Sequence, residues 1–206
     1  GAACFSYSNV KKVTLPTTLT TIGERAFYDS NIASPLKRVG VDPDHQSADL
    51  VLPPNVREVP NNAFGGCKQL TSAIIPGSVK RIGNSAFSNT GLTRVTLNEG
   101  LQSIDACAFA STALTELNVP ASVTDFHYYT GTWNSDAYYH CVFKDTPLKK
   151  ITIGGALTSV CQRMFMNYWG GYSSVLDHLT LEEVVLREGV TEIGADCFSY
   201  SNVKKV

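Results

Sequence analysis

The stretch LTSAIIPGSVKRIGNSAF, residues 70–87, carries the pattern that predicts the fold. Ala73 and Ile75 are separated by one residue, which is the period of a β-strand with one buried face. Pro76 ends this strand because proline has no backbone N–H to donate to a sheet. A glycine and a segment ending in Ala-Phe follow, and we predict there a one-turn helical piece whose Phe87 ring points back inward.

The same order of apolar residues recurs along the chain, as an array of structural repeats requires. Each recurrence ends in a phenylalanine that follows a small or apolar residue: Phe5, Phe27, Phe64, Phe87, Phe109, Phe143, Phe165 and Phe198. Four of the spacings between them are 22 or 23 residues, and the others are 37, 34 and 33. We therefore predict about seven stacked coils in a single domain over residues 1–206, with insertions in three of them.

The consensus L-x-x-V-x-L-P-x-x-V-x-x-I-G-x-x-A-F, matched by residues 70–87, resembles the BspA-like leucine-rich repeats of bacterial and protist surface proteins. The resemblance covers nearly the whole chain and is specific for fold, not for ligand. It implies an α/β leucine-rich repeat solenoid with short parallel strands on the concave face and short helical turns opposite. It also implies an extracellular or cell-surface protein with a role in adhesion.

The three insertions lie near residues 35–49, 127–141 and 166–178. In the first, Val39–Val41 and Leu50–Leu52 both resemble strands, so either could be the ladder strand and the other an added partner. The second and third insertions hold most of the tyrosines and both tryptophans of the chain.

These aromatic rings are candidate ligand contacts, because rigid Tyr and Trp side chains supply contact area at low entropic cost. The predicted binding residues are Tyr128, Tyr129, Trp133, Tyr138, Tyr139, Trp169 and Tyr172. Among them Trp133 and Trp169 are foremost, because Gly, Asn and Ser surround them and favour exposed loop tips. The alternative is a satellite core in which the rings pack on one another and hold the loops in place.

The outward residues of the predicted strands form a second candidate surface. Its polar and charged members are Lys12, Asp49, Ser72, Arg94, Glu116, Lys150 and Glu183. The neighbouring column reads Thr14, Val51, Ile74, Thr96, Asn118, Thr152 and Val185. Such a mixture is ordinary for a solvated sheet and also suits a broad protein-binding face, so both interpretations stay open.

A column of small polar residues stands three positions after most of the phenylalanines: Ser8, Ser30, Cys67, Thr90, Thr112, Thr146 and Ser201. A hydroxyl or thiol at this place can bond to backbone groups that a tight turn leaves without a partner. We therefore predict a structural role for this column.

Composition and charge narrow the classes of function. The chain has 17 Lys and Arg against 18 Asp and Glu, so its formal net charge of -1 does not attract a nucleic acid or an anionic membrane. No uninterrupted apolar run is long enough to predict a membrane span, and the N-terminus lacks the pattern of a signal peptide.

No catalytic or metal-binding pattern stands out. Four histidines lack the spacing of a zinc site: His45, His127, His140 and His178. The acidic residues Asp42, Asp44 and Asp49 lack the glycine and terminal glutamate of a calcium loop, which favours a solvated acidic turn. We therefore predict no enzyme activity, no metal and no cofactor.

The six cysteines are an even number, which would permit disulfides in a secreted chain. The repeat phase instead predicts buried thiols at Cys4, Cys67 and Cys197. Cys107 and Cys141 stand at equivalent positions of successive coils, at a separation within the usual disulfide window. The insertion before Cys141 can displace it, so we favour free thiols at this pair also.

The two ends of the chain are nearly identical, since GAACFSYSNVKKV at residues 1–13 recurs as GADCFSYSNVKKV at residues 194–206. The other coils are far more divergent, which indicates a larger duplicated unit or a fragment cut at matching points. Neither end resembles the polar capping coil of a solenoid, so we predict end-to-end self-association through exposed apolar edges.

The sequence thus predicts an extracellular or cell-surface recognition or adhesion module without catalytic activity. Its expected partner is a protein or a glycan, with host extracellular matrix among the candidates, and not a nucleic acid. The alternative is a structural spacer that displays another domain of a larger surface protein. Binding of a ligand by these coils would distinguish the two functions.

Overall fold

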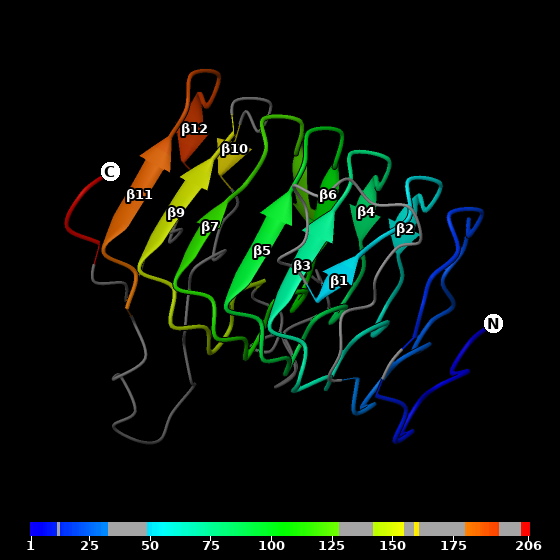
Figure 1. Cartoon of the computed structure of the whole chain (residues 1–206). Coiled ribbons are helices and arrows are strands. Elements are labelled where there is room, and N and C mark those ends of the chain that lie inside the picture. The colour runs from blue at the N-terminus through cyan, green and yellow to red at the C-terminus, as the bar shows by residue number, and fades with distance from the viewer. Residues whose placement is uncertain (12, 33–48, 128–141, 155–158, 161–179, 194–202) are drawn as a thin grey trace, which may run out of the picture.

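A computed structural model describes residues 1–206 except 12, 33–48, 128–141, 155–158, 161–179 and 194–202. In the described residues the chain winds through successive coils that lie side by side (Figure 1). The apolar ladder explains this arrangement, because a coil can bury its apolar face only against its neighbours.

Each coil from residue 50 onward contributes two short strands. The first strands are β1 (Leu50–Val51), β3 (Ser72–Ile75), β5 (Arg94–Leu97), β7 (Glu116–Asn118), β9 (Lys150–Ile153) and β11 (Glu183–Leu186). The second strands are β2 (Glu58–Val59), β4 (Arg81–Ile82), β6 (Ser103–Asp105), β8 (Asp125–His127), β10 (Ser159–Val160) and β12 (Glu192–Ile193).

The pairs among these strands are parallel and follow the order of the coils. The first strands form the sheets β1-β3-β5 and β7-β9-β11, and the second strands form the sheets β2-β4-β6-β8 and β10-β12. This confirms the predicted parallel strands of a leucine-rich repeat fold.

The ladder strand after the first insertion is β1. Leu50 lies opposite Ala73 of β3, and Val51 lies opposite Ile74. The competing stretch Val39–Val41 lies outside the described residues, so its structure stays a matter of prediction.

The second strand of each coil is a feature that the sequence pattern did not predict. Ile82 lies opposite Ile104, and both side chains are fully buried. The sequence shows this position only as one apolar residue per coil, because a strand of two or three residues is too short for its alternation to be seen.

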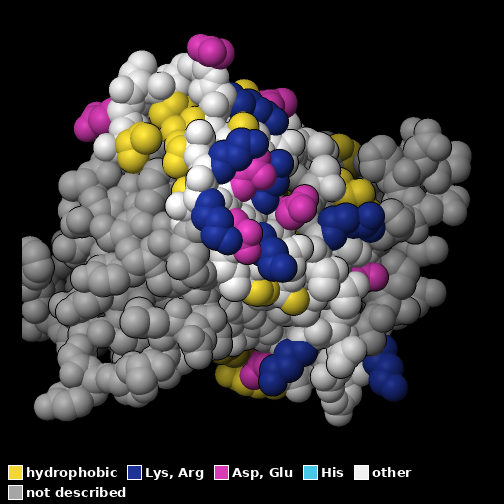
Figure 2. All heavy atoms as spheres, turned by 90° about the vertical axis from the view of Figure 1, so that its left-hand side faces the viewer, with side chains coloured by type: hydrophobic (Ala, Val, Ile, Leu, Met, Phe, Trp, Pro, Cys, Tyr) yellow, Lys and Arg dark blue, Asp and Glu magenta, His cyan; other side chains and the backbone are white. Residues whose placement is uncertain are grey.

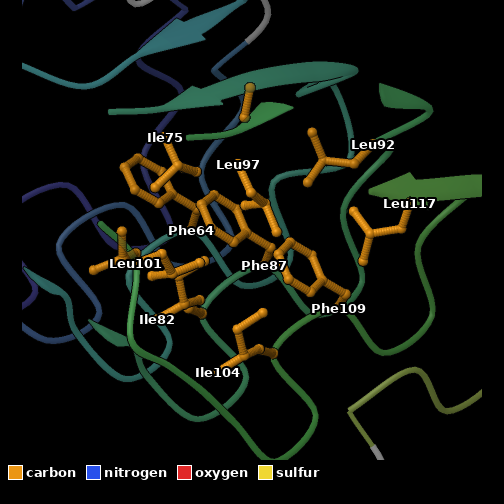
Figure 3. Packing of buried hydrophobic residues seen from close by; sticks show 14 of the residues in the cluster. Phe64, Ile75, Ile82, Phe87, Leu92, Leu97, Leu101, Ile104, Phe109 and Leu117 are labelled. Atoms are coloured by element: carbon orange, nitrogen blue, oxygen red, sulfur yellow. The ribbon is translucent and has the colours of Figure 1, made fainter. Parts of the chain in front are cut away.

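Stacked phenylalanine rings form the centre of the core. Each ring lies nearly parallel to the next, with centroids 5.2–5.6 Å apart, along the series Phe5, Phe27, Phe64, Phe87 and Phe109. Figure 3 shows Ile75 and Leu97 on one side of this row and Ile82 and Ile104 on the other. The predicted burial of Phe87 and Phe109 is confirmed, since neither ring is exposed to solvent.

The segments that carry these rings are tight turns, and no helix occurs in the described residues. In one such segment the N–H groups of Ala26, Tyr28 and Ser30 each donate to the carbonyl three residues earlier in the same coil. The N–H groups between them, those of Phe27 and Asp29, donate to the next coil, at 2.9 Å to the Ala63 carbonyl and 2.7 Å to the Gly65 carbonyl.

This alternation corrects the predicted helical piece. An α-helix keeps its backbone bonds within one segment, whereas here every second N–H crosses to a neighbouring coil. The geometry requires a residue with positive φ on each side of the phenylalanine, as at Ser85 (φ 52°) and Asn89 (φ 57°) around Phe87. Gly66 takes this conformation after Phe64, with φ 76°.

The predicted structural role of the small polar column is confirmed in the described coils. The hydroxyls of Ser30, Thr90 and Thr112 donate to the carbonyl of the phenylalanine three residues earlier, at 2.7–2.9 Å. Cys67 and Thr146 follow the first two insertions, and their side chains donate instead to the phenylalanine carbonyl of the preceding coil.

The first coil departs from the prediction. Cys4 was expected to be buried, but it is exposed, and the Phe5 ring beside it is 38 % exposed. The reason is that Phe5 stacks on Phe27 on one face only. Cys197, the equivalent of Cys4, lies outside the described residues.

Phe87→Ala and Phe109→Ala should each lower the free energy of unfolding by about 3–5 kcal/mol, because each removes a fully buried ring from the stack. Phe5→Ala is the matched control and should cost less, since its ring is partly exposed. Chemical denaturation measures all three changes. A loss below about 1 kcal/mol at both buried positions would show that the ladder has been assigned in the wrong register.

A pair of serines in one turn tests the backbone geometry. Ser85 has positive φ and Ser88 does not, while the hydroxyl of each makes a hydrogen bond to a neighbouring asparagine. Ser85→Gly removes the steric cost of the left-handed conformation, so that protein should be more stable than Ser88→Gly by about 1–2 kcal/mol. Equal stabilities in thermal or chemical denaturation would contradict the turn geometry.

Candidate binding face

The outward side chains of β1, β3, β5, β7, β9 and β11 form one surface, which we call the strand face. Parallel pairing places Ile74 beside Thr96 in one sheet and Asn118 beside Thr152 and Val185 in the next. Figure 1 shows the two sheets following one another across the same side of the molecule. The pairing therefore brings the predicted outward residues into rows within each of the two sheets.

A row of alternating charge crosses the C-terminal half of the strand face. Glu116 lies opposite Lys150, Lys150 opposite Glu183, and Glu183 opposite Lys205. The Glu183 carboxylate lies 3.3 Å from the Lys150 ammonium and 3.5 Å from that of Lys205. Figure 2, which views the molecule from the side of β11, likewise shows basic and acidic side chains interleaved.

The two lysines beside Glu183 lower the pKa of its carboxyl group. A hydrogen bond from Lys150, together with the positive charges of Lys150 and Lys205, holds the pKa of the Glu183 carboxyl below its ordinary value. The Glu183 carboxylate is therefore ionised at neutral pH, and it lies between two positive charges. Such a row aligns neighbouring coils and leaves little net charge to attract a partner.

The N-terminal half of the strand face differs from the prediction in two places. Ser72 lies opposite the exposed Arg94, yet Ser72 itself is buried, and its hydroxyl accepts a hydrogen bond from the Asp49 N–H. Val51 was expected to face solvent, but β1 is buried on both faces. The exposed rows are therefore shorter at this end than the pattern predicts.

Asp49 is engaged with the next coil and does not lie in a solvated acidic turn. One of its carboxylate oxygens accepts hydrogen bonds from the Thr71 and Ser72 N–H groups at 2.8 and 3.0 Å, and from the Thr71 hydroxyl. We call such a carboxylate, which accepts hydrogen bonds from the backbone of the next coil, a brace. For Asp49 this brace is found in place of the predicted solvated turn. Asp42 and Asp44 lie outside the described residues.

Glu99 makes a similar brace on the turn that follows β5. Its two carboxylate oxygens accept hydrogen bonds from the Ala121 and Ser122 N–H groups of the next coil, both at 2.9 Å. The Ala121 bond is the main cause that holds the pKa of Glu99 below its ordinary value, and the Ser122 bonds add to it. Sequence reasoning missed both braces because one acidic residue before or after a strand carries no distinct signal.

An ionic cluster joins three coils across the sheet of second strands. The Arg81 guanidinium forms ion pairs with Glu58 of the preceding coil and Asp105 of the following coil, and also donates to Asn61. Asp105 is buried, so the fork of the guanidinium supplies charge to a desolvated carboxylate. The cluster was not predicted, since it depends on the unpredicted second sheet.

An open hollow of about 430 Å³ with a mixed polar and apolar lining lies between the second and third described coils. Its walls are formed by Thr20, Thr21, Ile22, Asn55, Arg57, Glu58 and Pro60. The hydroxyl, amide and charged groups could hold a small polar ligand. The hollow could not be predicted from the sequence, because it depends on the distance between two neighbouring coils.

The described cysteines lie in different surroundings. Burial raises the pKa of the Cys67 thiol, whose sulfur donates to the Phe27 carbonyl at 2.9 Å, so this cysteine is a protonated core residue as predicted. Burial also raises the pKa of Cys107. Cys141 lies outside the described residues, so the state of the Cys107–Cys141 pair stays a prediction.

The aromatic candidates of the second and third insertions all lie outside the described residues. They are Tyr128, Tyr129, Trp133, Tyr138, Tyr139, Trp169 and Tyr172. Lys12 of the predicted strand face also lies outside them, as do His45, His140 and His178. The choice between a satellite core and a recognition surface therefore stays open.

Within the part of the chain that the structure describes, no group of three His, Cys, Asp or Glu side chains could hold a metal ion. The search of those same residues for a helix long and apolar enough to cross a bilayer finds none.

Glu99→Gln should weaken the dependence of stability on pH between about pH 5 and pH 3. The folded-state pKa of Glu99 is lowered, so its bonds to Ala121 and Ser122 stabilise the fold at neutral pH and are lost as the pH falls through that pKa. Glu188→Gln, at an exposed glutamate, is the matched control. Denaturation curves recorded across this range should separate the two variants, and identical slopes would contradict the brace.

Comparison with solved structures supports the fold. The crystal structure of the pneumococcal vaccine antigen PcpA matches 94% of this chain with a TM-score of 0.56 and 21% sequence identity. A leucine-rich cell surface protein from Faecalibacterium prausnitzii matches 98% of the chain with a TM-score of 0.47 and 18% identity. The chain spans 48% of the first structure and 62% of the second.

Comparison with sequence families agrees with the repeat pattern. No curated protein matches the chain. The family described as BspA type Leucine rich repeat region matches residues 1–36, 45–141 and 134–206, with six copies of the repeat. Because these ranges cover most of the chain, the protein belongs to the BspA-type leucine-rich repeat family.

Proposed function

We propose that this chain is a non-catalytic recognition module of an extracellular or cell-surface protein, and that it binds a protein or glycan partner. The observation that carries the proposal is the strand face, where parallel pairing sets Ile74 beside Thr96 and Asn118 beside Thr152 on neighbouring coils. Parallel coils give such a face an extended, repeated surface, which is how solenoid proteins bind partners.

The side chains of the strand face suit recognition through contact more than through charge. Thr96 and Asn118 are exposed, and Thr152 is half-buried. Lys150 and Lys205 lie against Glu183, so the charges of the row are already compensated. A partner would therefore meet hydroxyl, amide and methyl groups, and its binding should depend weakly on salt.

The aromatic insertions supply a second part of the proposed site. Trp133 and Trp169 are its leading candidate contacts, because their rings offer flat faces for a sugar or a protein side chain. Tyr128, Tyr129, Tyr138, Tyr139 and Tyr172 complete the candidate set. Membership of the BspA-type leucine-rich repeat family supports a location outside the cell.

A structural spacer is the second candidate function, and the braces between coils favour it. Asp49, Glu99 and Arg81 each join neighbouring coils through charged hydrogen bonds. Such contacts hold the array together and need no ligand. A spacer would leave the strand face without a partner and would display a neighbouring domain.

Binding of the whole chain to arrayed glycans and to extracellular matrix proteins tests the proposal. Thr96→Arg and Thr152→Arg place a large charged side chain on the strand face and should reduce affinity at least tenfold without unfolding the protein. Thr18→Arg is the matched control, because Thr18 is exposed in a turn outside the strands. Trp133→Ala and Trp169→Ala test the insertions separately in the same assay.

The outcomes of this assay distinguish recognition through the strand face, recognition through the insertions, and a spacer function. Loss of binding in the strand-face variants, with the Thr18 control unchanged, supports recognition through that face. Loss only in the tryptophan variants, with stability retained, assigns recognition to the insertions. Absence of any binding by the folded chain would favour the spacer function.

A further inference from the structure

The exposed large apolar side chains of the described residues gather at the two ends of the array. They are Phe5 (38 % exposed), Tyr7 (73 %), Ile193 (48 %) and Val206 (66 %). Residues at equivalent positions inside the array are buried: Phe87 and Ile82 are not exposed at all. These four side chains lack the cover that a neighbouring coil gives to Phe87 and Ile82.

The sequence indicates which coil that is. Residues 1–13 and 194–206 share 12 of 13 residues and differ only at Ala3 and Asp196. Other coils share only the apolar ladder. The same segment therefore occurs twice, once before the coil of Phe27 and once after β11.

The second occurrence shows what the segment contacts on its N-terminal side. The Lys204 N–H donates to the Glu182 carbonyl, and the Val184 N–H donates to the Lys205 carbonyl, both at 2.9 Å. The Lys204 ammonium lies 3.7 Å from the Glu182 carboxylate. Residues 10–13 have the same sequence as residues 203–206, Val-Lys-Lys-Val, and can make the same contacts with β11.

The first occurrence shows what the segment contacts on its C-terminal side. Phe5 stacks on Phe27 with ring centroids 5.3 Å apart, and the Phe5 N–H donates to the Ala26 carbonyl at 2.7 Å. The two copies thus show the contacts that one segment can make with the coil before it and with the coil after it. Joined together, they describe a continuous solenoid that passes from β11 through the repeated segment into the coil of Phe27.

We propose that residues 1–193 form a repeating unit and that β11 is a joint at which a second copy of this unit continues the solenoid. Residues 10–13 of the second copy take the register that residues 203–206 hold here, and its following coils cover Ile193. The partner is a second copy of this sequence, linked in one chain or bound as a separate molecule. This inference does not rest on the proposed function.

A tandem chain tests the joint directly. It consists of residues 1–193 followed by residues 1–206, so that Ile193 occurs once at the internal joint and once near the end. Ile193→Ala at the joint should lower the denaturant midpoint clearly, because the side chain is buried there. The same substitution near the end is the matched control and should change the midpoint little. Equal effects at both places would overturn the proposal.

Separate copies are tested with a chain that ends at residue 193. Its β11 edge lacks residues 194–206, so residues 1–13 of another copy should bind there and give head-to-tail oligomers in sedimentation, whereas residues 1–206 associate less. Added peptide 194–206 should dissociate these oligomers. Circular dichroism verifies that the shortened chain is folded. A folded chain that stays monomeric at high concentration would exclude separate copies as the partner.

Exchanging the charges of Lys11 and Glu182 tests, in the same sedimentation assay, whether these two residues pair between copies. Lys11 is equivalent to Lys204, which pairs with Glu182 at the exposed surface, so Lys11→Glu should weaken association of the shortened chain by about two- to fivefold. Adding Glu182→Lys to the same chain should restore it. Lys68→Glu is the matched control, at an exposed lysine away from both ends. If the shortened chain does not fold, the tandem chain decides, and equal midpoints there reject the joint.

Discussion

The structure depends on backbone hydrogen bonds that cross from one coil to the next in the phenylalanine turns. Because Phe27 and Asp29 donate to Ala63 and Gly65, the two coils are held at a distance at which the Phe27 and Phe64 rings stack, 5.2 Å apart. The small hydroxyl at Ser30 then satisfies the Phe27 carbonyl. The ring stack, the polar column and the positive φ angles are consequences of this one constraint.

Much of the fold could be predicted because its periodicity is long and repeated. The spacing of the phenylalanines, the Ala73–Ile75 alternation and the proline at position 76 indicate a coil with one strand and a turn. The turn geometry could not be predicted, because residues as different as Ser85 and Asn89 take the same left-handed conformation. In these turns the backbone hydrogen bonds to neighbouring coils outweigh the conformational preference of the individual residues.

The candidate site was predicted less completely than the fold. Strand pairing confirms the positions of Glu116, Lys150 and Glu183 in one row, because a register of stacked coils follows from the repeat. The burial of Val51 and the braces of Asp49 and Glu99 depend on how segments between coils lie, which periodicity does not determine. Recognition by Trp133 and Trp169 remains a prediction, because both lie outside the described residues.

Within the phenylalanine turns the bonds between coils all point in the same direction. In the turns the N–H groups of Phe5, Phe27, Phe64, Phe87 and Phe109 all donate to the following coil. The peptide dipoles of these turns therefore add along this column, as they do along a helix. Other N–H groups between coils, such as those of Lys80, Thr93 and Lys204, donate to the preceding coil. The dipoles along the phenylalanine turns are thus opposed by those on other sides of the coils.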